Sequence, residues 1–392
     1  MATLAPSRPS PPPASAPALP ARPSLRELGP NWYATVMGTA IVATTAAGLP
    51  LGLSGVPGLR TAAAAVWAVA ALTLLGLLSV SAAQWIRSPG RVRDRLLDPA
   101  VAPFYGCPAM AFPAVGAATL AAGRDVIGGT AAVAAAAVLF AAGAVTGLVV
   151  AVAVPYLMVT RHETGPASAT PVWLLPVVAP MVPAALGPLL VPHLPAGQAR
   201  EALLLGCFSL FGVSLLATLL ILPLVFARLV HHGPLPLALT PALFLVLGPL
   251  GQSVTATGRL ADAAPGAIAG PYAHALSAFG VLYGVPVLGF ALLWLALAAA
   301  LTVRATRRGM PFSMTWWAFT FPVGTCVTGS EVLARHTGLT AYDWLAVALF
   351  VLLVASWGVA GFRTVRDVLR GELLAAPRRA RPALPPTTAR TR

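Results

Sequence analysis

Acidic residues and histidines, the side chains that most often act as acids, bases or metal ligands, are scarce in this chain. Its 392 residues include 11 acidic residues and six histidines, and nearly all of them fall at the edges of long apolar runs. The three cysteines, Cys107, Cys207 and Cys326, lie inside such runs and form no C-x-x-C pair. No paired-aspartate motif, H-E-x-x-H or G-x-S-x-G occurs. The sequence therefore predicts neither an enzyme nor a metal centre nor a bound cofactor.

Glu331 is the exception among the acidic residues, because it falls inside an apolar run, near the outer end of 315–334. Carriers that couple transport to protons or cations usually keep carboxylates or histidines at mid-membrane, and the corresponding runs of this chain have almost none. Two interpretations of Glu331 stay open. It could pair with Arg335 one helical turn later, or it could control ion access at the outer mouth of a pathway.

The overall composition indicates a membrane protein. Hydrophobic residues make up 58% of the chain and charged residues 9%, whereas soluble domains carry about 25% charged residues. These values exclude an ordinary soluble globule, a disordered chain and a disulfide scaffold. The net charge of +14 resides mostly in short loops and tails beside the apolar runs, where arginines orient a membrane protein. We therefore expect a lipid bilayer as the partner and no nucleic acid.

Ten apolar runs are long enough to cross a bilayer as helices, because a span needs about 20 residues. Their length and their lack of alternation exclude membrane strands. The sequence therefore predicts an all-α polytopic membrane protein with ten transmembrane helices. The runs cover roughly 31–51, 62–86, 103–123, 127–157, 172–192, 201–226, 238–258, 272–302, 315–334 and 341–362.

The arginines are distributed unevenly between the two sides of the predicted membrane. Twenty of the 25 basic residues fall on one side, and five single arginines fall in the opposite loops. Because cytoplasmic loops collect positive charge, we expect both termini in the cytoplasm, a plasma-membrane location and a transport domain at 30–368. A Pro-rich tail at 1–29 and a basic tail at 369–392 are predicted to be disordered. The five opposite arginines are Arg60, Arg124, Arg200, Arg259 and Arg335.

The odd-numbered runs begin at a regular spacing of roughly 66 to 77 residues, which indicates five copies of a helical hairpin. Five hairpins can close into a ring with one helix of each pair inside. The odd runs also hold most of the interior prolines, and a mid-helix proline frees a carbonyl that must face protein or water in lipid. We therefore expect the odd helices to line a central pore, although prolines are also tolerated in membrane helices generally. The residues concerned are Pro113, Pro180, Pro249 beside Gly248, and Pro322 with Gly324.

The expected pore lining favours an anion as the solute. Helices that break inside the membrane present free N–H groups and partial positive charge at the N-terminus of each half-helix. Several such breaks around one axis would attract anions without a buried arginine. The net positive charge of the protein would add to this attraction at the cytoplasmic mouth.

Four motifs resemble one known family. Trp316–Gly324, which reads W-W-A-F-T-F-P-V-G, resembles the signature of the tellurite-resistance/dicarboxylate transporter family, which includes malic acid transporters, sulfite pumps and slow anion channels. Pro171–Pro176 is similar to its P-x-W-x-x-P motif, Leu247–Ser253 to its L-G-P-x-G-x-S motif, and Trp32–Thr39 to its opening helix. The resemblance covers about residues 30–365.

That resemblance implies a ring of five hairpins around a central pore, with the odd helices inside and usually three copies in a homotrimer. It also implies that a phenylalanine of the ninth helix plugs the pore. The motif position assigns this role to Phe321, with Phe319 as the alternative and plain core packing as the simpler interpretation of Phe321. Phe112 is a candidate to narrow the pore at the same depth, and Gly38 and Thr39 are expected to line it.

We therefore expect a small anionic solute to cross the plasma membrane through a phenylalanine-gated pore. The expected solutes are C4-dicarboxylates such as malate, or small oxyanions such as tellurite. The alternative is an efflux pump or channel for sulfite or another small inorganic anion. A membrane-embedded enzyme and a passive assembly subunit are the competing classes. The residues do not distinguish a channel from a coupled carrier, and they do not name the anion.

Overall fold

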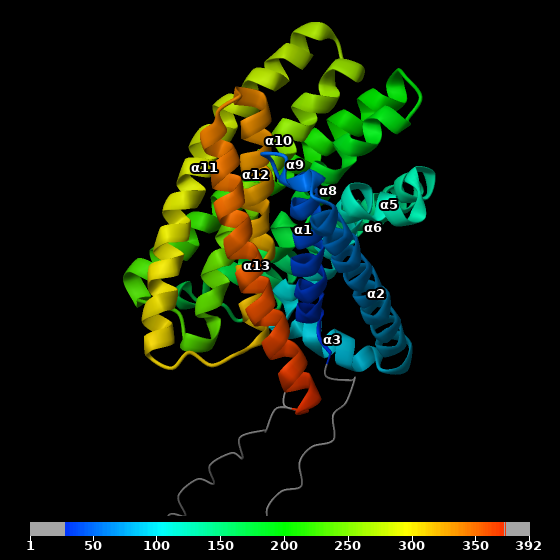
Figure 1. The fold of residues 1–392 in the computed structure, drawn as a ribbon. Coiled ribbons are helices and arrows are strands. Elements are labelled where there is room, and N and C mark those ends of the chain that lie inside the picture. The colour runs from blue at the N-terminus through cyan, green and yellow to red at the C-terminus, as the bar shows by residue number, and fades with distance from the viewer. Residues whose placement is uncertain (1–27, 372, 374–392) are drawn as a thin grey trace, which may run out of the picture.

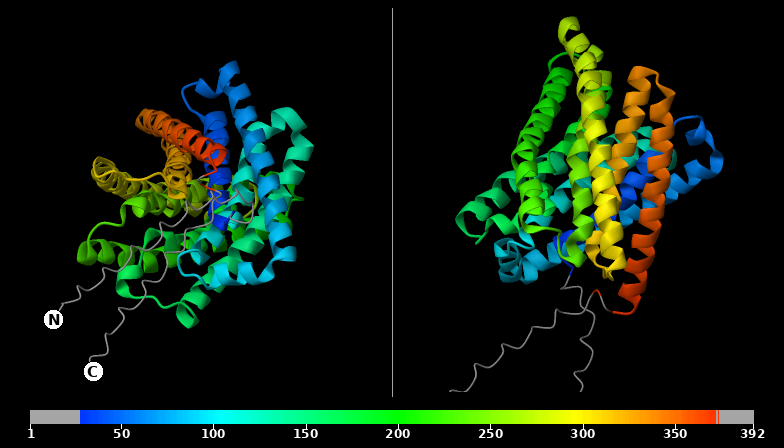
Figure 2. Two further views of the ribbon diagram at one scale, coloured as in Figure 1. Left: turned by 90° about the horizontal axis from the view of Figure 1, so that it is seen from below. Right: turned by 90° about the vertical axis from the view of Figure 1, so that its left-hand side faces the viewer.

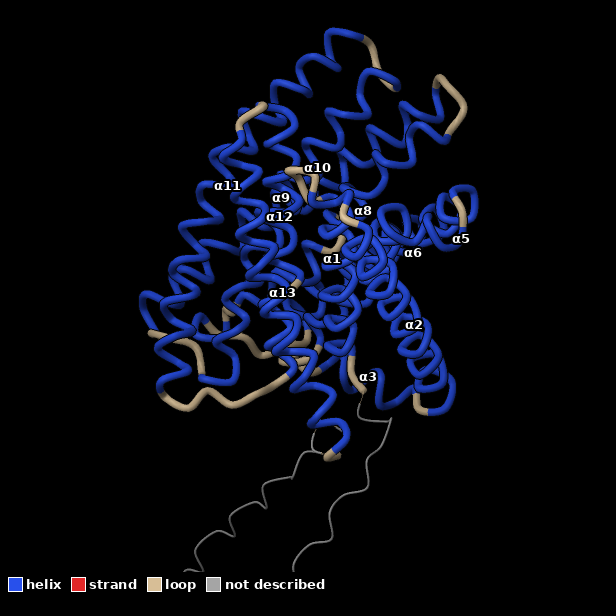
Figure 3. Tube along the Cα trace, viewed as in Figure 1, coloured by secondary structure: helices blue, strands red, loops and turns tan. Residues whose placement is uncertain are grey.

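A computed structural model describes residues 28–371 and 373, and every regular element among these residues is helical (Figure 3). The two predicted tails, 1–29 and 369–392, lie almost entirely outside the described residues. The described part of the chain forms a bundle in which the start of α1 and the end of α13 lie at the same end (Figure 1). This end also carries α3, Pro89–Leu97, a short helix with three arginines.

Five long helices form the outside of the bundle, and they correspond to the even-numbered runs. Each is a continuous helix of 30 to 38 residues with many exposed apolar side chains, as expected for helices that face lipid. Interior prolines in three of them do not end the helix. The outer helices are α2 (Pro57–Arg87), α6 (Gly129–Thr160), α9 (Gln198–His232), α11 (Gly270–Arg307) and α13 (Thr340–Leu369).

The odd-numbered runs form shorter inner helices that are buried and interrupted. In the spans that contain α4 and α10, 61% and 78% of the most apolar window is buried, against 17–28% in the outer helices. The inner helices are α1 (Tyr33–Gly48), α4 (Gly106–Ala118), α7 (Leu174–Val178) with α8 (Met181–Leu186), α10 (Leu247–Ala263) and α12 (Phe321–Thr337).

The interruptions take a different form in each inner segment. α4 continues through a π-helical turn at Thr119–Gly123 into α5, Arg124–Ile127. α7 and α8, with their flanking 3-10 turns, bend by 56° at a break just before Met181. 3-10 helices precede α10 and α12, at Leu237–Val246 and Met314–Phe319.

The structure supports the prediction of ten full-length spans in part. Among the described residues, seven helices are long and apolar enough to cross a membrane, or eight if the bent α7–α8 pair counts as one span. α1 has 16 residues and α12 has 17, so each measures about 25 Å at 1.5 Å per residue, shorter than a hydrocarbon core of about 30 Å. A 3-10 helix precedes each of them, at Pro30–Trp32 and at Met314–Phe319. The chain is a multi-pass membrane protein.

The inner helices contact one another in a closed order. α1 packs against α4, α4 against α7 and α8, α8 against α10, α10 against α12, and α12 against α1. Each outer helix packs on the inner segment that precedes it in the chain, and α11, α12 and α13 run side by side in Figure 1 and in the right-hand view of Figure 2. Glycine permits close contacts between these helices. A Cβ at Gly251 of α10 would lie 2.6 Å from the backbone nitrogen of Cys326 in α12.

Candidate functional site

Three cavities follow one another between the inner helices, and α10 gives their order. The first, the N-terminal cavity, has a volume of about 680 Å³ and contacts α10 at Gly248. The second, the central cavity, has a volume of about 320 Å³ and contacts Gln252, Thr255 and Arg259. The third, the vestibule, has a volume of about 1720 Å³ and contacts Arg259 and Asp262. The three cavities therefore succeed one another along the helix.

The lining residues follow helical periodicity on each inner helix. Positions three or four apart share one face of a helix, so a lining stripe should recur at that spacing. On α1 the stripe is Ala34, Met37, Ile41, Thr44 and Gly48. On α10 it is Gly248, Gln252, Thr255, Arg259 and Asp262.

The N-terminal cavity is mainly apolar and lies at the first turns of the inner helices. Residues near the starts of α1, α4, α7, α10 and α12 all line it, so five helix N-termini surround one space. Its apolar side chains include Met37, Met110 and Trp317, and Cys107 lies among them. This end of the pathway offers helix dipoles but no charged side chain among the described lining residues.

Phe321 separates the N-terminal cavity from the central cavity. It is the only described residue that lines both, and 5% of it is exposed. Phe321 is the first residue of α12, directly after Thr320, where the backbone leaves the 3-10 helix. The Thr320 hydroxyl donates to the Trp317 carbonyl at 2.6 Å, and the Trp317 indole donates to the Thr364 hydroxyl of α13 at 2.9 Å. These bonds fix the backbone that carries the ring.

The central cavity is small and lined by neutral polar groups. The Thr255 and Thr328 hydroxyls share a hydrogen bond of 2.7 Å, and Thr44 lies on the facing helix α1. The Gln252 side chain is buried and makes no hydrogen bond with another described residue. Its amide is therefore available to a solute in this cavity.

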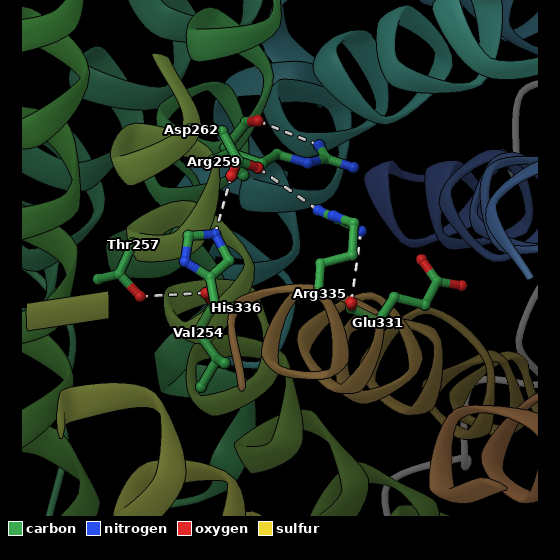
Figure 4. A network of polar contacts seen from close by, with 8 residues as sticks. Val254, Thr257, Arg259, Asp262, Glu331, Arg335 and His336 are labelled. Carbon is green, nitrogen blue, oxygen red and sulfur yellow. Dashed lines mark hydrogen bonds and ion pairs between the residues drawn. The ribbon is translucent and has the colours of Figure 1, made fainter. Parts of the chain in front are cut away.

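The vestibule gathers most of the charged side chains of the pathway (Figure 4). Arg335 lies 3.5 Å from the Asp262 carboxylate, and His336 Nε2 lies 2.8 Å from the same group. The Arg259 guanidinium donates to the Ala185 carbonyl of α8 at 3.0 Å. Arg124 contributes a further positive charge to the lining.

Glu331 lies in this vestibule with 8% of its surface exposed, and it does not form the predicted pair with Arg335. Arg335 donates instead to the Glu331 backbone carbonyl at 3.4 Å and turns its charge to Asp262, while the Glu331 carboxylate points away (Figure 4). Glu331 Oε1 is buried without a hydrogen-bond partner. A Cβ at Gly48 would lie 3.0 Å from Oε2, so the glycine leaves room for the carboxylate.

The prolines and glycines predicted to shape the pore divide into two groups. Gly248, Pro249 and Pro322 line the N-terminal cavity and Pro113 lines the central cavity. Pro322 is the second residue of α12 and lies in the first turn of this helix, where the N–H that proline lacks is not needed. Two other residues serve helix packing. Pro180 lies at the α7–α8 break against Gly147 of α6, and Gly324 packs against Ile41 of α1.

Four other predicted residues do not face these cavities. Gly38 allows Thr320 and Trp317 to approach α1. Thr39 faces α13, where Trp357 Nε1 donates to its hydroxyl at 3.1 Å. The Phe319 ring packs edge-on against Phe244 at 4.8 Å between centroids. Phe112 lines a separate cavity together with Tyr33 and Arg95 and none of the three cavities above.

Arg259 is the residue that the sequence analysis missed. It was expected in a loop because the apolar run ended at 258, but it lies inside α10 and lines both the central cavity and the vestibule. The spacing 248, 252, 255 and 259 was the signal that could have placed it on the lining face. Within residues 28–371 and 373, no group of three or more His, Cys, Asp or Glu residues could hold a metal ion.

Residues 27–365 match the sequence profile of the voltage-dependent anion channel family. The chain is 26% identical over 351 residues to an uncharacterized transporter of Methanocaldococcus jannaschii, which covers 89% of this chain and 96% of that protein. It is 28% identical over 360 residues to sulfite efflux pumps of Arthroderma otae and Trichophyton rubrum, which covers 88% of this chain and 92% of each pump.

Proposed function

The chain belongs to the voltage-dependent anion channel family, and on that premise we propose that it carries small anions across the membrane through the three cavities, with Phe321 as the gate. One observation carries this proposal. Phe321 alone among the described residues lines both the N-terminal and the central cavity. An apolar ring at such a point blocks passage by filling volume and by excluding water.

The electrostatics of the pathway favour anions. The first turns of five inner helices surround the N-terminal cavity, and the helix dipoles place partial positive charge at that end. At the other end, Arg124, Arg259 and Arg335 outnumber Asp262 and Glu331 in the vestibule. A cation would meet an unfavourable potential at both ends.

Sulfite is the solute that we place first. Sulfite efflux pumps are among the similar proteins, and the central cavity offers hydroxyl and amide groups to a compact oxyanion. C4-dicarboxylates such as malate, and other small oxyanions such as tellurite, are the solutes that the sequence motifs predict. They form the comparison arms of the experiment.

We extend the proposal to the assembly. The closed order of contacts among the inner helices supports a ring of ten helices in five hairpins around the pathway. Arg91, Arg93 and Arg95 in α3 lie at the end where α1 begins, which supports a cytoplasmic position for the N-terminal cavity. We propose that the protein forms a homotrimer in the plasma membrane, with one pathway in each copy.

The test is solute flux into liposomes that contain the purified full chain. Phe321→Ala should raise the flux of radiolabelled sulfite, and the solute should emerge chemically unchanged. Phe319→Ala is the matched control. Phe319 lies two residues before Phe321, and its ring packs in an aromatic cluster outside the cavities. Unchanged flux in a folded Phe321→Ala protein, or an equal rise in Phe319→Ala, would contradict the gate. Malate and tellurite flux in the same liposomes ranks the solutes.

A further inference from the structure

Arg259 occupies the junction between the neutral central cavity and the charged vestibule. It is the only charged side chain among the described residues that line the central cavity. It lies in α10 four residues before the helix ends at Ala263, and it is partly accessible rather than fully buried. An anion that moves between the two cavities must therefore pass this guanidinium.

The guanidinium has unused hydrogen-bonding capacity. One nitrogen donates to the Ala185 carbonyl at 3.0 Å, and this bond anchors the side chain to the last turn of α8. The remaining N–H groups have no acceptor among the described residues. Arginine carries five N–H donors in a planar fork, so an anchored guanidinium can still offer two parallel donors to the oxygens of an anion.

Glu331 is the acidic side chain without a partner in the vestibule. Its Oε1 is buried and has no hydrogen-bond partner, and its carboxylate forms no ion pair within the described part of the chain. The other charged or titratable groups that line the vestibule or border Glu331 are Arg335, Asp262, His336, Arg124 and His193. Arg335 and His336 both engage Asp262, which leaves Arg259 and Glu331 without such a partner.

We propose that Arg259 is a binding site for the transported anion at this junction, and that the Glu331 carboxylate competes with the solute for its positive charge. The ligand is a small oxyanion or carboxylate with two oxygens on one atom. The proposal rests on the proposed function and adds to it a residue that determines affinity. Conduction requires binding that is favourable but still allows release. A single guanidinium with a competing carboxylate nearby meets both requirements.

The test is equilibrium binding of radiolabelled sulfite to the purified full chain in detergent. Arg259→Gln should raise the apparent Kd by roughly tenfold or more, because a hydrogen-bonded charge is lost. Arg259→Lys keeps the charge but loses the planar pair of donors, so its Kd should lie between that of wild type and that of Arg259→Gln. Arg60→Gln is the matched control, since Arg60 is an exposed arginine paired with Asp125 at 2.7 Å. An Arg259→Gln protein that binds sulfite as tightly as Arg60→Gln would overturn the proposal.

Glu331→Gln tests the competition with the opposite sign. It keeps the size of the side chain and removes its charge, so the apparent Kd for sulfite should fall severalfold. An unchanged or higher Kd would overturn the role of Glu331. If Arg259→Gln does not fold, Arg259→Lys and Glu331→Gln still decide the proposal. If the wild-type chain binds neither sulfite nor malate, the site is disproved.

The binding measurement is independent of the gate. Phe321→Ala with unchanged flux, together with weaker binding in Arg259→Gln, would remove the gate and leave the Arg259 site standing. Raised flux in Phe321→Ala, together with unchanged binding in Arg259→Gln, would do the reverse. The failure of one proposal is therefore distinguishable from the failure of the other.

Discussion

The two ends of the pathway differ in what their walls offer a solute. The N-terminal cavity has apolar side chains, helix N-termini and a ring at its inner limit, whereas the vestibule is wide and holds five charged side chains. In the proposed pathway, passage at the first end would depend on volume and on the exclusion of water. At the second end, it would depend on charge. Because Phe321 and Arg259 lie on different helices and act by different physics, each can be altered without the other.

The size of the side chain at position 321 should have the largest effect. We expect flux to increase from wild type to Phe321→Leu to Phe321→Ala, by roughly an order of magnitude for alanine, because the barrier is an apolar constriction. The increase should occur for sulfite, malate and chloride in liposomes, since volume does not distinguish anions by charge. A rise confined to one of these solutes would show that the ring acts as a specific contact, and the contrast between the two ends would break down.

Ionic strength should affect the charged end by a smaller factor. Screening shortens the reach of a charge to about 8 Å at 0.15 M salt, so the apparent Kd of wild type for sulfite should rise a few-fold as a large organic salt is added. This rise in Kd should be smaller in Arg259→Gln than in wild type. In Phe321→Ala it should be as large as in wild type. Equilibrium binding across a salt series measures this dependence. Equal salt dependence in wild type and Arg259→Gln would remove Arg259 from the electrostatic end.

The packing that aligns the two ends should show the smallest effect, in stability. Gly251 lies between the Gly248 and Arg259 positions of α10 and touches the α12 backbone at Cys326. Gly251→Ala should therefore cost about 1–3 kcal/mol, as overpacking does in well-packed cores, and lower the thermal midpoint in detergent. Gly248→Ala is the control, because no other atom lies within 4 Å of a Cβ there. Equal midpoints for the two variants would show that this contact can relax.

The sequence motifs singled out Phe321, which the structure places at the start of α12, where it lines two cavities; its role as a gate stays a prediction. They could not define the rotation of each helix about its axis, which side-chain packing decides. Gly38 and Thr39 therefore proved to face Thr320 and Trp357 instead of the cavities. The lining residues of each helix lie three or four positions apart, because such positions share one face of a helix. This spacing identifies the lining face only once one lining residue is known.

Hydropathy set the helix ends incorrectly for a related reason. A charged residue lowers the mean hydropathy of any apolar window that contains it. The predicted seventh run therefore ends at 258, and Arg259 falls in the predicted loop. In the structure α10 continues to Ala263, because a face that lines a vestibule can be charged while the opposite face stays buried. The sequence also could not predict the 3-10 segments before α10 and α12. These segments are at least as apolar as the α-helices that follow them, so hydropathy does not distinguish the two kinds of helix.

Cys107 gives the pathway a chemical marker that the chain already carries. It is the only one of the three cysteines that lines any of the three cavities, and it lies on the N-terminal side of Phe321. Cys107 is 2% exposed, so a charged thiol reagent added at that end would react with it only when the side chains around it move, whereas the same reagent added at the vestibule would also need the ring to move aside. The rate of labelling from the two sides would therefore report how often the gate opens, in the unmodified protein and without any transported solute.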